Sequence, residues 1–138
     1  MSDIQRLIDT TFPFVQDLLS KYGEFYPLAA AVTTSDNITQ VGTYDGDEHP
    51  LSDEVIEGLK RGLRAKQIDY KSIAIFYDVR VVVPATKTKT DAVAVFAEAQ
   101  NDEIAYIIFY PYVLTNHKTV NWTDSPWKEA TEKEIFIK

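Results

Sequence analysis

The side chains best suited to chemistry alternate along one acidic segment: Asp45, Asp47 and His49. Carboxylate oxygens and an imidazole nitrogen at this spacing can converge on a divalent metal ion, and Glu24 and Asp78 could supply further ligands. The segment lacks the ligand spacing of a calcium-binding EF-hand loop. Acidic turns that precede helices also serve as turn and cap residues. We therefore predict a structural loop here and keep a metal site as the alternative.

A second polar pair lies two residues apart on a predicted strand. Asp78 and Arg80 must point to the same face of that strand, because successive side chains alternate between the faces. The two side chains could form an ion pair at the rim of the sheet, or they could mark a site that recognises a partner or ligand. We adopt the ion pair as the simpler interpretation.

Other catalytic and cofactor chemistry has little support. The chain contains no cysteine and only two histidines. The lack of cysteine excludes disulfides, thiolate nucleophiles and zinc–sulfur sites. Neither the Gly-x-Ser-x-Gly motif of serine hydrolases nor a phosphate-binding P-loop is present. We predict no catalytic residue and no cofactor.

The chain is acidic. Its 138 residues include 14 Lys and Arg against 21 Asp and Glu, which gives a net charge of −7 and a pI of about 4.7. This charge argues against binding to nucleic acid or to an anionic membrane. No apolar run is long enough to span a membrane, and the N-terminus lacks the basic and apolar regions of a secretory signal. We therefore expect a cytoplasmic protein.

The first element that positions these residues is a helix between Ser2 and Gly23. Ser2 followed by Gln5 fits a capping box, and Gly23 fits a left-handed residue that ends the helix. Pro13 removes one backbone hydrogen bond, so we expect either a kink or two short helices.

The remaining periodicity predicts a hairpin, a helix beginning at Ser52, three longer strands and a short final helix beginning at Ser125-Pro126. The expected strands are Leu28–Thr34, Ile38–Tyr44, Ser72–Val83, Thr90–Ala99 and Ile104–Val113. The order α-β-β-α-β-β-β predicts an α+β fold: a single antiparallel five-stranded sheet with the helices on one face, in a domain over residues 1–113. Residues 114–138 form a C-terminal extension that packs on this domain or on a partner. The order resembles that of roadblock and profilin-like domains.

The two predicted sheet faces are both largely apolar. The face expected beneath the helices carries Ile73, Ile75, Tyr77, Val79, Val81 and Val83. The opposite face includes Phe76 beside Asp78 and Arg80, and the fifth strand is apolar on both sides. The second face therefore needs a cover, which could be the aromatic extension or a second copy of the chain. Candidate interaction residues are Glu24, Phe76, Asp78, Arg80 and Phe96.

Several short sequence segments are similar to those of a group of small bacterial proteins of unknown function. The segments are Tyr22–Pro27, Tyr44–Pro50, Tyr77–Val81 and Lys89–Ala92. The resemblance covers about residues 15 to 113 and implies a bacterial origin and a single domain. It carries no reaction, cofactor or catalytic residue. The similar segments fall at loops and strand ends, where functional sites often lie.

These observations favour a non-enzymatic interaction protein whose partner is another protein or a second copy of the chain. One version is an immunity or antitoxin-like protein that masks a basic toxin by charge complementarity. A second version is an adaptor homodimer of roadblock-like architecture. The alternative is a metal-dependent enzyme or small-ligand binder that uses the segment Asp45–His49.

Overall fold

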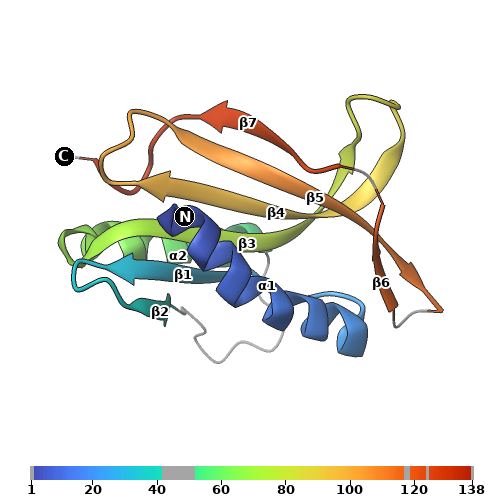
Figure 1. Ribbon diagram of the computed structural model, residues 1–138, viewed down its shortest axis with the longest axis horizontal. Helices are drawn as coiled ribbons and strands as arrows, with labels where there is room; N and C mark the ends of the chain where they lie inside the picture. Colours follow the sequence, from blue (N-terminus) through green and yellow to red (C-terminus); the bar gives the residue numbers. More distant parts are fainter. Residues whose placement is uncertain (1, 42–51, 117–118, 124, 138) are drawn as a thin grey trace.

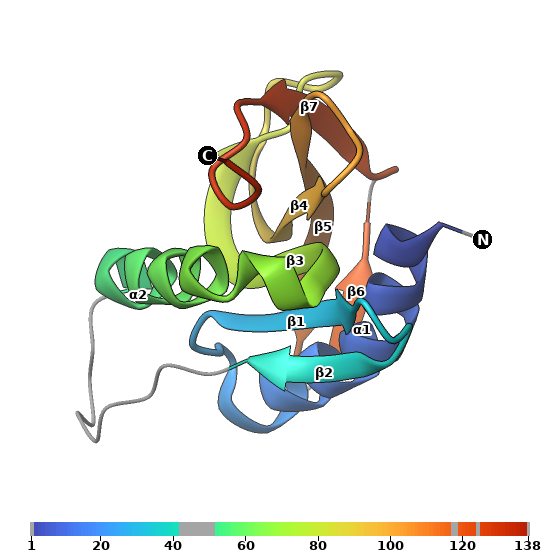
Figure 2. The same cartoon turned by 90° about the vertical axis from the view of Figure 1, so that its left-hand side faces the viewer.

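A curled antiparallel sheet separates two helices (Figures 1 and 2). The computed structural model describes residues 2–41, 52–116, 119–123 and 125–137. Within them the elements are α1 (Asp3–Tyr22), β1 (Leu28–Thr33), β2 (Ile38–Val41), α2 (Ser52–Ala65), a 3-10 turn (Gln67–Asp69), β3 (Tyr70–Val82), β4 (Lys89–Ala99), β5 (Ala105–Thr115), β6 (Thr119–Trp122) and β7 (Trp127–Thr131). The candidate metal ligands Asp45, Asp47 and His49 lie outside the described residues. Neither described helix combines the length and apolar character that a membrane crossing requires.

Helix α1 confirms the predicted ends. The Ser2 side chain accepts a hydrogen bond from the Gln5 backbone N–H at 3.1 Å. Gly23 has a φ of 74°, and its N–H donates to the Leu19 carbonyl. The Gln5 side chain donates to Asp9 instead of reaching back to the cap, so only half of the capping box forms.

The alternative of two short helices is wrong, because α1 continues through Pro13. One buried stripe runs on both sides of the proline and holds the helix against the sheet, which compensates for the missing hydrogen bond. The stripe consists of Leu7, Ile8, Thr11, Val15 and Leu19.

Among the described residues the sheet contains seven strands, so the predicted number of five is wrong. The strand order is β2-β1-β3-β4-β5, and the outer edge of β5 is shared by two short strands. Strand β7 pairs with Ala105–Phe109 and β6 pairs with Tyr112–Thr115. The C-terminal extension therefore adds strands to the same sheet.

The predicted final helix is wrong, because residues 127–131 form β7. Ser125-Pro126 is a local signal for the start of a helix. The edge of β5 offers backbone hydrogen-bond partners to this segment, and a local sequence signal contains no information about them. The segment therefore pairs with β5 as a strand and does not form a helix.

The helices lie on opposite faces of the sheet, so the expectation that both cover one face is wrong (Figure 2). We call the two sides the α1 face and the α2 face. The buried core of the α1 face includes Leu7, Leu19, Ala74, Phe76, Val93, Val95 and Tyr112. The core of the α2 face includes Leu59, Leu63, Ile73, Ile75, Phe96 and Ile135. The long strands are apolar on both sides, so each face requires its own helix.

The chain closes the α2 face with a C-terminal clasp, which consists of Glu98 and the backbone of residues 134–136. The Glu98 side chain is 1% exposed, and its carboxylate accepts the backbone N–H groups of Glu134, Ile135 and Phe136 at 2.6 to 3.2 Å. Lys60 of α2 adds an ion pair to the Glu134 carboxylate at 2.7 Å. These contacts bury the Ile135 side chain completely.

Candidate functional site

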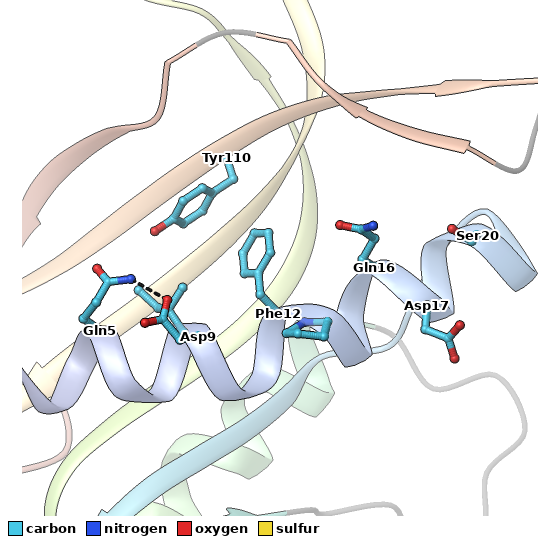
Figure 3. Close-up of a pocket in the computed structure, with 9 residues that line it drawn as sticks. Gln5, Asp9, Phe12, Gln16, Asp17, Ser20 and Tyr110 are labelled. Atoms are coloured by element: carbon cyan, nitrogen blue, oxygen red, sulfur yellow. Dashed lines mark hydrogen bonds between the residues drawn. The ribbon is translucent and has the colours of Figure 1, made fainter.

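An open groove of about 630 Å³ runs along the exposed side of α1 (Figure 3). Its lining comes from α1 and from one residue of β5. The lining residues are Gln5, Ile8, Asp9, Phe12, Pro13, Gln16, Asp17, Ser20 and Tyr110. The groove therefore lies where the helix meets the outer half of the sheet.

Aromatic rings fix α1 against β5 and β6. The Phe12 ring centroid lies 4.8 Å from that of Tyr110 and 4.9 Å from that of Trp122. The Trp122 indole N–H donates to the Gln16 side chain at 3.2 Å. Trp122 nevertheless stays 37% exposed. Phe12 and Tyr110, the aromatic residues that line the groove, are themselves half-buried.

The polar residues along the groove are the carboxylates Asp9 and Asp17 and the neutral Gln5, Gln16 and Ser20. The Asp9 carboxylate accepts a hydrogen bond from the Gln5 side chain at 2.8 Å. Burial raises the pKa of the Tyr110 hydroxyl, and the nearby Asp9 charge raises that pKa further. Asp17 is exposed and pairs with Lys21 at 3.0 Å. Asp9 has no ion pair with a cationic side chain among the described residues.

Pro13 gives α1 a further acceptor. Proline has no backbone N–H, so the Asp9 carbonyl lacks its usual helical donor four residues later. Asp9 and Pro13 both line the groove. Asp9 therefore contributes to α1 both a carboxylate and a carbonyl that lacks its usual helical donor.

A carboxyl cluster occupies another part of the α1 face. The buried Tyr112 hydroxyl donates to the Asp78 carboxylate at 2.7 Å. Burial raises the pKa of Asp78 to about 6, and the charges of Asp91 and Glu24 contribute, although the Tyr112 hydrogen bond opposes the shift. Burial and the hydrogen bond to Asp78 both raise the pKa of Tyr112. This cluster concentrates negative potential that its surroundings neutralise only in part.

The predicted ion pair of Arg80 has a different partner. Arg80 and Asp78 share a face of β3 as expected, but the Arg80 guanidinium pairs with Asp91 of β4 at 3.2 Å. Their side chains are 65% and 48% exposed, so this pair contributes little to stability. The cross-strand register places Arg80 directly opposite Asp91, which explains the choice of partner.

Packed aromatic rings connect the groove with the carboxyl cluster on the α1 face. The Tyr112 ring contacts the Trp122 ring at 5.8 Å, and Trp122 contacts Phe12 in the groove. The row Phe12–Trp122–Tyr112 thus leads from the groove to Asp78.

The other predicted interaction residues are divided between the two faces. Phe76 is fully buried on the α1 face, and Phe96 is 2% exposed on the α2 face. Neither ring is therefore accessible at the surface of this chain. Glu24 is exposed and close enough to Asp78 to influence its pKa. Among the described residues, no group of three or more acidic or histidine side chains has an arrangement that could hold a metal ion.

The sequence did not single out five residues that complete this region: Asp9, Phe12, Asp91, Tyr110 and Tyr112. Asp91 and Tyr112 face Asp78 only through the register of three strands. The mid-helix proline was the available signal for the groove, because a proline inside a helix leaves the carbonyl four residues earlier without its donor.

We compared the chain with protein-family models, curated proteins and solved structures, and found no significant match in any of the three.

Proposed function

We propose that this chain is a non-enzymatic interaction protein that binds a basic partner protein through its α1 face. The groove along α1 carries this proposal. It combines partly exposed aromatic walls with the Asp9 and Asp17 carboxylates. Aromatic side chains are enriched at protein interfaces, where they supply large contact areas with few rotatable bonds.

Electrostatics favours a basic partner. The net charge of −7 attracts positively charged proteins over distances of about 8 Å at physiological salt. The exposed Glu24 carboxylate near Asp78 adds negative charge outside the groove. An immunity or antitoxin-like protein that masks a basic toxin is the version that fits this charge.

A second copy of the chain is the less favourable occupant of this groove. A symmetric contact would place the groove of one copy against that of another. Asp9 and Asp17 would then approach the same two carboxylates of the second copy. Like charges brought together at an interface cost binding free energy.

The test begins with a partner captured from an extract of the source cells, then purified and titrated against the protein by calorimetry. We compare the double variant Asp9→Lys/Asp17→Lys with Glu54→Lys/Glu57→Lys. The second pair makes the same charge change at exposed positions of α2. We expect the α1 variant to lose at least about tenfold in affinity, and the α2 variant to lose less than about threefold.

Three results would contradict the proposal. Equal binding by both double variants would place the contact away from the α1 groove. Capture of acidic proteins alone would contradict the charge argument. Turnover of a small molecule that depends on Asp78 would indicate an enzyme.

A further inference from the structure

We propose that an arginine side chain of the partner protein anchors in the α1 groove, beside Asp9 and against the rings of Phe12 and Tyr110. This inference rests on the proposed function and names the chemical group that the groove would recognise. It depends on three features of the groove that are independent of the overall charge.

The first feature is a pair of acceptors from one residue. One oxygen of the Asp9 carboxylate accepts from Gln5, which leaves the other oxygen for a further donor. The Asp9 carbonyl lacks its usual helical donor, because residue 13 is proline. A helical carbonyl points toward the residue four positions later, so this oxygen points toward Pro13, which also lines the groove. A guanidinium group has five N–H donors in a planar fork, so it can donate to the free carboxylate oxygen and still offer donors to other acceptors on α1.

The second feature is the aromatic wall. Phe12 and Tyr110 meet edge to face with their centroids 4.8 Å apart, and Figure 3 shows both rings above the same stretch of α1 as Asp9. A planar guanidinium stacks on such rings more readily than a hydrated ammonium does.

The third feature is the contrast with other rings of this chain. Lysine ammonium groups lie over Phe96, Tyr106 and Phe136 at 4.5 to 5.7 Å from the ring centroids. Within the described part of the chain, no lysine or arginine makes such a contact with Phe12 or Tyr110. A cation over this ring pair would therefore have to come from another molecule.

The probe is the peptide acetyl-Gly-Gly-Arg-Gly-Gly-amide, titrated into the ¹⁵N-labelled full chain and followed by NMR. Two matched peptides carry lysine or norleucine in place of arginine. We expect shifts confined to residues near Asp9, Phe12 and Tyr110, with the arginine peptide binding most tightly and the norleucine peptide showing no saturable shift. Asp9→Asn should weaken the arginine peptide at least about fivefold, and Glu57→Gln on α2 should leave it unchanged.

Pro13→Ala separates recognition from folding. Alanine restores the N–H donor to the Asp9 carbonyl, so the melting temperature should rise while affinity for the arginine peptide falls at least about threefold. A purely structural role of this turn would not produce opposite changes in stability and binding.

Several outcomes would overturn the inference. Arginine-peptide binding that is unchanged by both Asp9→Asn and Pro13→Ala would remove its basis. Equal binding of the arginine and lysine peptides would show a response to charge alone. Tighter binding of spermine than of the arginine peptide at these residues would indicate a polyamine site. If a purified partner protein still responds to Asp9→Lys/Asp17→Lys, only the arginine anchor fails and the proposed function stands.

Discussion

Glu98 and Asp78 are buried or partly buried carboxyl groups on opposite faces of the sheet, and their surroundings differ in kind. On the α2 face, Glu98 accepts the N–H groups of three consecutive residues in the C-terminal clasp. On the α1 face, Asp78 accepts a single hydroxyl hydrogen bond from Tyr112 and lies near the charges of Asp91 and Glu24. Backbone N–H donors replace the water that would otherwise solvate the Glu98 carboxylate. The Asp78 carboxylate has lost solvating water through burial and lies near other negative charges.

This difference separates a structural carboxylate from a candidate for recognition. The backbone donors around Glu98 stabilise its charge and fix the clasp in return. Around Asp78, burial outweighs the Tyr112 hydrogen bond, and the pKa rises to about 6. An external cation can stabilise the incompletely compensated charge of Asp78, whereas backbone donors already stabilise the charge of Glu98.

The largest effect is expected for Glu98→Gln. The new amide NH₂ would face backbone N–H donors in a buried site, so the free energy of unfolding should fall by about 2–4 kcal/mol. Urea denaturation measures the loss, and amide exchange of residues 134–136 should accelerate. Glu132→Gln changes an exposed carboxylate of the same segment and should leave both measurements almost unchanged. A loss below about 1 kcal/mol would mean that the clasp is held mainly by its apolar contacts.

Tyr112→Phe is expected to have the next largest effect. It removes the one hydroxyl that donates to Asp78, so stability at pH 8 should fall by about 1–2 kcal/mol. The pKa of Asp78 should rise further, because the hydrogen bond lowers it in the native protein. NMR titration of the Asp78 carboxyl carbon measures this shift. An unchanged titration would break the contrast with Glu98, because Tyr112 would then not be the donor that matters.

Asp78→Asn should instead increase the stability of the fold at high pH. The folded-state pKa of about 6 lies above the ordinary value of 3.8. The folded protein therefore holds this proton more tightly, and the resulting stability is complete below about pH 4 and is lost as the pH rises through 6. Asparagine removes this dependence and should raise stability by about 1 kcal/mol at pH 8, after allowance for partial exposure. Urea midpoints at pH 8 and pH 4 test the sign, and a gain of equal size at both values would contradict it.

The smallest effect is expected for Arg80→Gln. The Arg80–Asp91 pair is exposed on both sides, so its loss should cost less than about 0.5 kcal/mol. Thermal melts at low and high salt measure the contribution of this ion pair to stability. At high salt the melting temperatures of the variant and the wild type should be indistinguishable. A larger, salt-resistant loss would show that Arg80 supports the carboxyl cluster more directly.

Local chemistry made the ends of α1 and the strand faces predictable. Ser2 and Gly23 act through bonds to neighbouring residues, and the alternation of Ile75 with Phe76 follows from strand geometry. The side of the sheet that each helix covers depends instead on the path of its connections. Both faces of the long strands were correctly seen to be apolar, but that pattern fits either helix on either face.

The carboxyl sites were harder to anticipate because their partners are distant in sequence. Glu98 binds backbone groups 36 to 38 residues away, and backbone groups leave no pattern in a sequence. Asp78 was selected as a candidate, but Tyr112 reaches it only through the pairing of β3, β4 and β5. The same long-range pairing explains why residues 127–131 form a strand despite a local helix signal.

The two short strands on the edge of β5 also protect the chain from aggregation. Ala105–Phe109 is an apolar strand segment that, if uncovered, would offer its backbone to other chains. Pro111 lies between the segments covered by β7 and β6, and its carbonyl accepts the Thr123 N–H at 3.2 Å on the outer edge. Its missing N–H faces the same edge, so the proline leaves the pairing with β4 intact. Cleavage that releases β7 would therefore create a self-associating edge, and Pro111 would limit how far an added strand could extend.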